Sequence, residues 1–132
     1  MLEIGPPITA LYVGLNAFIA LIVAGLVVRQ RGKHKIGIGD GGNADLLQAI
    51  RVQGNFVEYV PLALLIIYMV ELGGTADWAV HGLGIMLTVG RIAHAQGLSS
   101  SPGQSAGRGI GTLLTWLVYI VGGALCIYYG LS

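Results

Sequence analysis

Four long runs of apolar residues make up most of the sequence, and short polar or glycine-rich segments separate them. A helix that crosses the hydrocarbon core of a bilayer needs roughly 20 predominantly apolar residues. By this measure we expect membrane-spanning helices over residues 8–28, 43–72, 75–97 and 106–130. The segment "LSSSPGQS", residues 98–105, predicts a loop between the last two helices. The pattern therefore predicts an all-α integral membrane protein, a four-transmembrane-helix bundle that occupies residues 1–132 as one domain.

The composition agrees with a bilayer as the solvent. Hydrophobic residues make up 55% of the chain and charged residues 10%, whereas an ordinary soluble domain is roughly 25% charged. A soluble domain of this size buries too little of its surface to hide so many apolar residues. The net charge of +1 gives no electrostatic signal for nucleic-acid binding, and the single cysteine, Cys126, excludes a disulfide within the chain.

The charged residues between the runs predict the orientation in the membrane. The segment between the first two helices carries four cations, Arg29, Arg31, Lys33 and Lys35. Glu71 and Asp77, in contrast, flank the second connection. Positively charged connections stay on the cytoplasmic side. Four crossings would then place both termini outside and the connection near Arg108 on the cytoplasmic face.

A stripe of polar residues interrupts the second helix in "RVQGNFVEYVP", residues 51–61. Arg51, Asn55 and Glu58 are spaced at i, i+4 and i+7, so they share one face of a helix. Tyr59 borders the stripe. Pro61 predicts a kink just beyond it, because proline cannot donate the helical hydrogen bond and crowds the preceding turn. A kink there would open room beside the stripe.

Two interpretations of this stripe are open. In the first, Arg51 and Glu58 form an internal salt bridge that pins the helix to its neighbours. In the second they form a binding site, because an intramembrane charge costs about 2.5–3.5 kcal/mol on insertion scales and is retained mostly where it has a function. The stripe combines a cation, an anion, an amide and a phenol, which are the partners that a small zwitterionic peptide needs.

A second polar set, Arg91, His94 and Gln96, lies in the third helix, where Arg91 and His94 share a face. His94 fits either a hydrogen-bonded bundle residue or a ligand-binding residue. No zinc site is predicted, because the three histidines are scattered and no Cys/His spacing accompanies them. The run "GRGIG" lacks the preceding strand of a nucleotide-binding loop, so Gly107 and Gly111 predict a close helix contact instead.

These motifs resemble the MAPEG family of membrane-associated proteins in eicosanoid and glutathione metabolism, which includes the microsomal glutathione transferases. The run "RVQGNFVEYVPLALLIIYMVE" resembles the signature of the family's second helix. "VGRIAH" resembles the third helix of its prostaglandin E synthase branch, and "VVRQR" resembles the end of its first helix. The chain looks most similar to small bacterial members, which implies a bacterial inner-membrane location. The resemblance also implies a homotrimer, with glutathione bound as co-substrate between neighbouring subunits at the cytoplasmic end.

The resemblance assigns individual residues to the glutathione site. It implies contacts with glutathione from Arg51, Asn55, Glu58 and Tyr59, from Gln53 and Arg29 near the carboxylates, and from His94 on the third helix. The family's catalytic arginine corresponds to Arg108. Leu98 and Thr112 stand where the eicosanoid enzymes have tyrosines, which disfavours a specialised leukotriene or prostaglandin synthase.

The implied function is detoxification by a membrane transferase that conjugates the glutathione thiolate to lipophilic electrophiles, with reduction of lipid peroxides as a further reaction. An arginine suits this chemistry because it stays protonated at neutral pH. Its positive charge beside the sulfur would lower the thiol pKa from about 8.5 and so favour the thiolate. Two alternatives belong to other classes: a non-catalytic glutathione-binding or scaffold protein, and a small four-helix transporter. Such transporters carry their essential glutamate in the first helix, where this chain has only Asn16 as a strongly polar residue.

Overall fold

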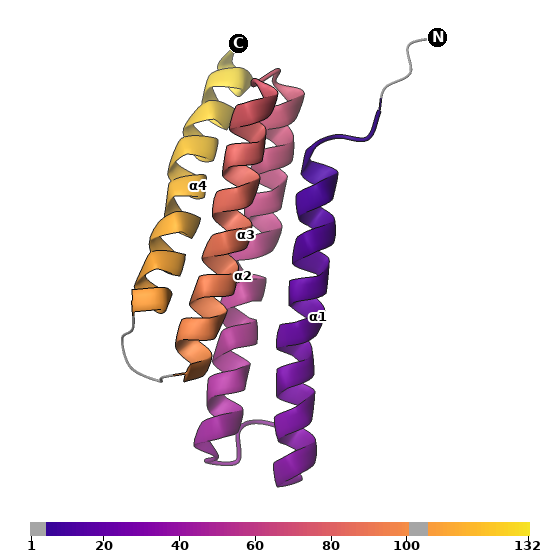
Figure 1. Cartoon of the computed structure of the whole chain (residues 1–132), viewed down its shortest axis with the longest axis vertical. Helices are drawn as coiled ribbons and strands as arrows, with labels where there is room; N and C mark the ends of the chain where they lie inside the picture. Colours follow the sequence, from indigo (N-terminus) through magenta and orange to yellow (C-terminus); the bar gives the residue numbers. More distant parts are fainter. Residues whose placement is uncertain (1–4, 101–105) are drawn as a thin grey trace.

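The computed structural model describes residues 5–100 and 106–132 and shows an all-α protein (Figure 1). The described residues form four helices, α1 (Thr9–His34), α2 (Ala44–Leu72), α3 (Asp77–Ser100) and α4 (Ala106–Leu131). The helices lie side by side and alternate in direction. As expected for four antiparallel crossings, α3 ends and α4 begins at the end of the bundle that holds the α1–α2 connection, whereas α1 begins and α4 ends at the opposite end (Figure 1).

Within the described residues, α1, α2 and α4 are long and apolar enough to cross a membrane. α3 is less apolar because it contains His81, Arg91 and His94. It lies alongside the other helices nevertheless (Figure 1), and both Arg91 and His94 are buried. Large apolar side chains such as Phe18 and Leu21 lie on the outside of the bundle, where a bilayer would solvate them. The predicted all-α membrane bundle is confirmed, with α3 as its most polar helix.

Two helix boundaries differ from the prediction. α1 continues through residues 29–34, which the pattern places in a loop, and ends where Lys35 adopts a left-handed conformation with φ 56°. The basic residues of this last turn interact favourably with the negative end of the helix dipole, which favours the extension. α3 continues to Ser100, past the expected end at residue 97. The remainder of the predicted loop, residues 101–105, lies outside the described residues.

The extra turn of α3 is stabilised by a side chain from α2. The Gln48 amide nitrogen donates hydrogen bonds to the backbone carbonyls of Leu98 and Ser99, the latter at 2.9 Å. The last four carbonyls of a helix have no partner within the helix. Gln48 supplies a partner for two of them, so the apolar pattern alone places the end of α3 too early.

Glycines bring α3 and α4 into close contact. A Cβ atom added at Gly111 would overlap the carbonyl oxygen of Gly90 and would lie 2.6 Å from the Cβ atom of His94. One added at Gly107 would lie 3.0 Å from the carbonyl oxygen of Ala93. These distances confirm the close helix contact that the Gly107–Gly111 spacing predicts. The contact holds the first turns of α4 against the part of α3 that carries Arg91 and His94.

α2 lies between the other helices, and the two larger of its three apolar clusters show how it is oriented. The first cluster joins α2 to α3 and α4 and consists of Ala63, Ile67, Val70, Val80, Leu83, Leu87 and Val118. The second joins α2 to α1 and the end of α3 and consists of Val23, Val52, Phe56, Val60 and Leu98. Because these side chains occupy the inward faces of α2, they determine which polar residues of the same helix face the protein and which face outward.

The end of the bundle where α1 begins is closed by a carboxylate. Glu71 of α2 accepts hydrogen bonds from the backbone N–H groups of Ile8 at 2.6 Å and Thr9 at 2.9 Å, and from the Thr9 hydroxyl at 2.7 Å. α1 has no capping side chain at its own N-terminus. The carboxylate of a different helix therefore satisfies its first N–H groups and complements the positive end of its dipole.

Further polar contacts join α1 to α3 just inside this end. The Tyr12 hydroxyl lies 2.7 Å from Nδ1 of His81, and its ring packs directly over Gly84. The Asn16 amide nitrogen donates to the Thr88 hydroxyl at 3.1 Å and to the Tyr12 carbonyl at 2.8 Å. We refer to Thr9, Tyr12, Asn16, Glu71, His81 and Thr88 together as the capping cluster. It links α1 to both α2 and α3.

Candidate intramembrane polar site

The charged residues of the α2 stripe lie on the outer surface of the single chain. Nη1 of Arg51 lies 3.7 Å from Oε1 of Glu58, and each side chain is about half exposed, at 53% and 56%. The Arg51 guanidinium passes over Gly54, where an added Cβ atom would lie 3.2 Å from Nη1. The predicted Arg51–Glu58 salt bridge therefore exists, but it lies within one helix. The ion pair therefore does not by itself link α2 to another helix of the chain.

The inner side of the stripe meets a buried arginine from α3. Arg91 is 1% exposed. Its Nη2 donates to Oδ1 of Asn55 at 2.5 Å, and its Nη1 donates to the Thr115 hydroxyl at 3.4 Å. Its Cζ atom lies 5.8 Å from the centre of the Tyr59 ring, a cation–π distance. We refer to Asn55, Tyr59, Arg91 and Thr115 as the arginine cluster, which joins α2, α3 and α4.

The arginine cluster is not fully satisfied within the chain. Nε of Arg91 is buried and has no hydrogen-bond partner among residues 5–100 and 106–132. In the described residues, the ion pairs are His34–Asp45 and Arg51–Glu58, and neither involves Arg91. A buried cation without a carboxylate partner is costly unless another anion approaches it. The cluster therefore has the electrostatics of an anion-binding site.

Aromatic residues of α4 hold Tyr59 in place beside this cluster. The Tyr119 hydroxyl donates to the backbone carbonyl of Tyr59 at 2.6 Å, and the two rings meet edge to face at 5.8 Å. The indole N–H of Trp116 donates to the Tyr59 hydroxyl at 3.4 Å. Trp116 is exposed, so the Tyr59 hydroxyl lies at the edge of the bundle and its ring lies inside, next to Arg91.

The other predicted site residues are distributed over all four helices. His94 is 3% exposed on α3, packs against Gly111, and has no partner for its Nδ1. Arg108 is half-buried in the first turn of α4, where its carbonyl accepts a hydrogen bond from the Thr112 hydroxyl at 3.0 Å. Arg29 is exposed on α1, and Gln53 is half-buried on α2. Arg29, Gln53 and His94 take no part in the hydrogen bonds that Arg91 donates to Asn55 and Thr115.

Sequence reasoning missed part of the cluster on α4. Arg91 is recognised as polar but is not assigned to the site, and Thr115, Trp116 and Tyr119 are not considered. A signal was available, because Arg108, Thr112, Thr115 and Tyr119 are spaced at i, i+4, i+7 and i+11. This is the same one-face periodicity that defines the α2 stripe. Two polar stripes on separate helices predict a shared polar interface more strongly than one does.

The bundle and its intramembrane charges define an integral membrane protein of the helical type. The sequence model of the MAPEG family matches residues 9–128, and the chain belongs to this family. It is 40% identical over 90 residues to the inner membrane protein YecN of Escherichia coli strain K12 and, equally, to that of the O6:H1 strain CFT073. Each match covers 68% of this chain and 69% of the relative. The name of these relatives states a membrane location and no reaction.

Proposed function

We propose that this protein is a glutathione-dependent membrane transferase, which conjugates the glutathione thiolate to lipophilic electrophiles and also reduces lipid peroxides. The observation that carries the proposal is the buried Arg91 beside Asn55 and Tyr59, which has no carboxylate partner in the part of the chain that the structure describes. Asn55 and Tyr59 are two of the positions at which the family resemblance implies glutathione contacts. An anionic ligand at this point would offset the buried charge.

The chemistry of the α2 stripe matches the groups of glutathione. Glu58 suits the ammonium of the γ-glutamyl part, and Arg51 suits a carboxylate in a charge-assisted hydrogen bond. The charged ends of the two side chains lie 3.7 Å apart in the single chain, so glutathione would bind here by replacing this ion pair with contacts to its own carboxylate and ammonium. The Asn55 amide suits a peptide group, and Gln53 and Arg29 would assist at the carboxylates. His94 would line the site from α3.

A homotrimer would complete the site. In the single chain Arg51 and Glu58 are about half exposed on a membrane-spanning helix. A charge facing lipid at mid-helix costs about 2.5–3.5 kcal/mol on insertion scales. A neighbouring subunit packed on this face of α2 would remove the charges from lipid and enclose glutathione between subunits. A monomer at working concentration would contradict this part of the proposal.

Arg108 is our candidate for thiol activation. It lies in the first turn of α4, where the positive end of the helix dipole also favours an anion. In conjugation, the thiol proton leaves to water and the thiolate sulfur attacks the electrophilic carbon. A carbon–sulfur bond forms and the leaving group departs with its electron pair. In peroxide reduction, two glutathione molecules are oxidised to the disulfide while the hydroperoxide is reduced to an alcohol and water.

The test is a conjugation assay on purified protein with chlorodinitrobenzene, combined with an ultraviolet titration of bound glutathione. Wild-type protein should show a thiolate absorption band at neutral pH. In Arg108→Ala the band should move to higher pH, and the rate at pH 7.4 should fall by about ten-fold, which is the loss of thiolate when a thiol pKa of about 6.5 returns to about 8.5, with glutathione still bound by calorimetry. Binding without conjugation in the wild type would favour a glutathione-binding scaffold. No binding, together with substrate uptake into proteoliposomes, would favour the transporter.

A further inference from the structure

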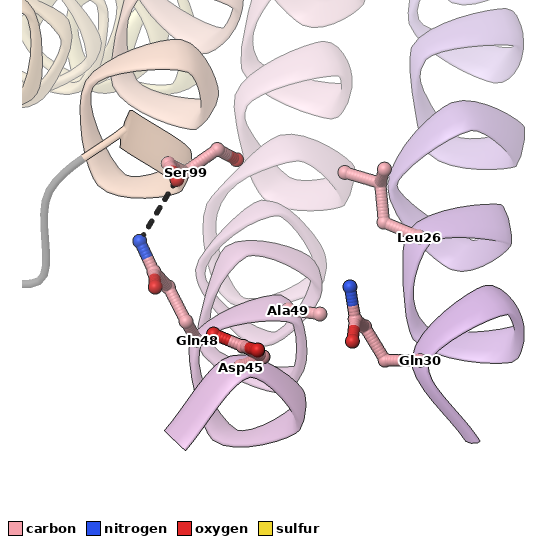
Figure 2. A pocket seen from close by; sticks show the side chains of 6 residues that line it. All are labelled: Leu26, Gln30, Asp45, Gln48, Ala49 and Ser99. Carbon is pink, nitrogen blue, oxygen red and sulfur yellow. Dashed lines mark hydrogen bonds between the residues drawn. The ribbon is translucent and has the colours of Figure 1, made fainter. Parts of the chain in front are cut away.

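A second polar site lies at the end of the bundle that holds the α1–α2 connection. It is a cavity of about 200 Å³ between α1, α2 and α3, lined by Leu26, Gln30, Asp45, Gln48, Ala49 and Ser99 (Figure 2). Arg51, Glu58 and the members of the arginine cluster are not among its lining residues. The cavity is therefore distinct from the proposed glutathione site, and a ligand bound in it would be independent of the proposed function.

Amide and carboxylate side chains line the cavity (Figure 2). The Gln48 amide nitrogen is used in hydrogen bonds to the carbonyls of Leu98 and Ser99, so its oxygen is turned away from α3 (Figure 2). Oε1 of Gln30 is buried and accepts no hydrogen bond from any described residue. The Asp45 carboxylate lies between these two glutamines in the view of Figure 2. An unpaired buried oxygen costs free energy unless a donor reaches it, so a hydrogen-bond donor beside Gln30 would be favourable.

The local charge favours a cationic donor. Asp45 contributes a carboxylate, and its Oδ2 lies 4.0 Å from Nε2 of His34. α3 ends at Ser100 beside the cavity, and the carbonyls of a helix C-terminus carry partial negative charge. A primary ammonium has three N–H donors and no acceptor, which matches a carboxylate and two amide oxygens. The volume is below the roughly 300–1,000 Å³ of sites for drug-sized ligands, so it suits a small head group.

The position of the cavity in the bundle identifies the source of the ammonium. It lies near the level at which α1 ends at His34 and α2 begins at Ala44, where membrane spans meet lipid head groups. Lys33 is exposed and lies three residues after Gln30, on the same side of α1. A cation at that position suits a phosphate. We propose that the cavity binds the head group of an ethanolamine phospholipid, with the ammonium at Gln30, Asp45 and Gln48 and the phosphate near Lys33.

The experiment measures lipid retention by native mass spectrometry of the full-length protein. The protein is equilibrated with equal amounts of phosphatidylethanolamine, phosphatidylcholine and phosphatidylglycerol that have the same acyl chains. The choline lipid is the matched ligand control, because its trimethylated nitrogen keeps the charge but cannot donate a hydrogen bond. We expect about ten-fold more ethanolamine lipid than choline lipid, the ratio that corresponds to one hydrogen bond with a charged group.

Variants assign the preference to the cavity. In Gln30→Leu and in Asp45→Asn the ratio of ethanolamine to choline lipid should fall to about one. Asp77→Asn is the matched control, because Asp77 also lies in the first turn of a helix but at the other end of the bundle. It should keep the wild-type ratio.

Three results would overturn the proposal. The first is equal retention of the two lipids by the wild type, and the second is an unchanged ratio in both cavity variants. The third is displacement of the bound lipid by free phosphoethanolamine at equal concentration, which would assign the cavity to a soluble amine.

Discussion

At the end of the bundle where α1 begins, the Glu71 carboxylate accepts three hydrogen bonds. In the arginine cluster, in contrast, the guanidinium of Arg91 is buried and its Nε has no partner among the described residues. Both clusters place a charge in a membrane-spanning bundle and both join α2 to other helices. In the capping cluster the charge has its partners within the chain, although Asn16 keeps one amide oxygen unpaired. In the arginine cluster an anion has to come from outside the described residues.

This difference indicates different roles. A charged group whose hydrogen bonds are satisfied contributes to stability, and its removal is felt in folding. A buried charge that lacks a partner reduces stability and persists where it takes part in a function. We therefore assign the capping cluster to the fold and the arginine cluster to ligand binding. Three variants would test this assignment.

The largest effect is expected for Glu71→Ala. It removes hydrogen bonds to a charged group from two backbone N–H groups and a hydroxyl, and the unfolding free energy should fall by about 3 kcal/mol. Chemical denaturation in detergent would measure it, with the exposed Asp77→Ala as control. Glutathione affinity of the folded fraction should be unchanged. A stable Glu71→Ala protein with weakened glutathione binding would reverse the assignment.

Arg91→Met should have an intermediate effect, which falls on glutathione affinity rather than on stability. Methionine fills a similar volume and removes the buried charge, so stability should change by no more than about 1 kcal/mol. Calorimetry should show glutathione affinity reduced by ten-fold or more, which is at least about 1.4 kcal/mol. A loss of stability as large as that of Glu71→Ala, with full affinity, would make Arg91 a structural residue.

The smallest effect is expected for Asn55→Ala. Asn55 is an uncharged member of the arginine cluster and accepts one hydrogen bond from Arg91. Its removal should weaken glutathione binding by about 1 kcal/mol, or roughly five-fold, and leave the oligomer intact. Size-exclusion chromatography provides the control for assembly. Wild-type affinity in both Asn55→Ala and Arg91→Met would exclude the cluster from the binding site.

The number, type and approximate bounds of the helices follow from the sequence, because the length of an apolar run and the residues that end it are local properties. The periodicity of the α2 stripe likewise predicts that Arg51 and Glu58 share a face, and the structure confirms it with a 3.7 Å ion pair. The Gly107–Gly111 spacing predicts the close α3–α4 contact for a similar reason, since it depends only on small residues one turn apart.

Only the tertiary structure decided which polar residues meet. Glu71 reaches Ile8 and Thr9 across more than sixty residues of sequence, and Arg91 reaches Asn55 and Thr115 on two other helices. These pairings depend on the rotation of each helix about its axis. That rotation is set by the packing of side chains from several helices at once, including the contact at Gly111. No single helix contains that information, so no pattern within one helix could predict it.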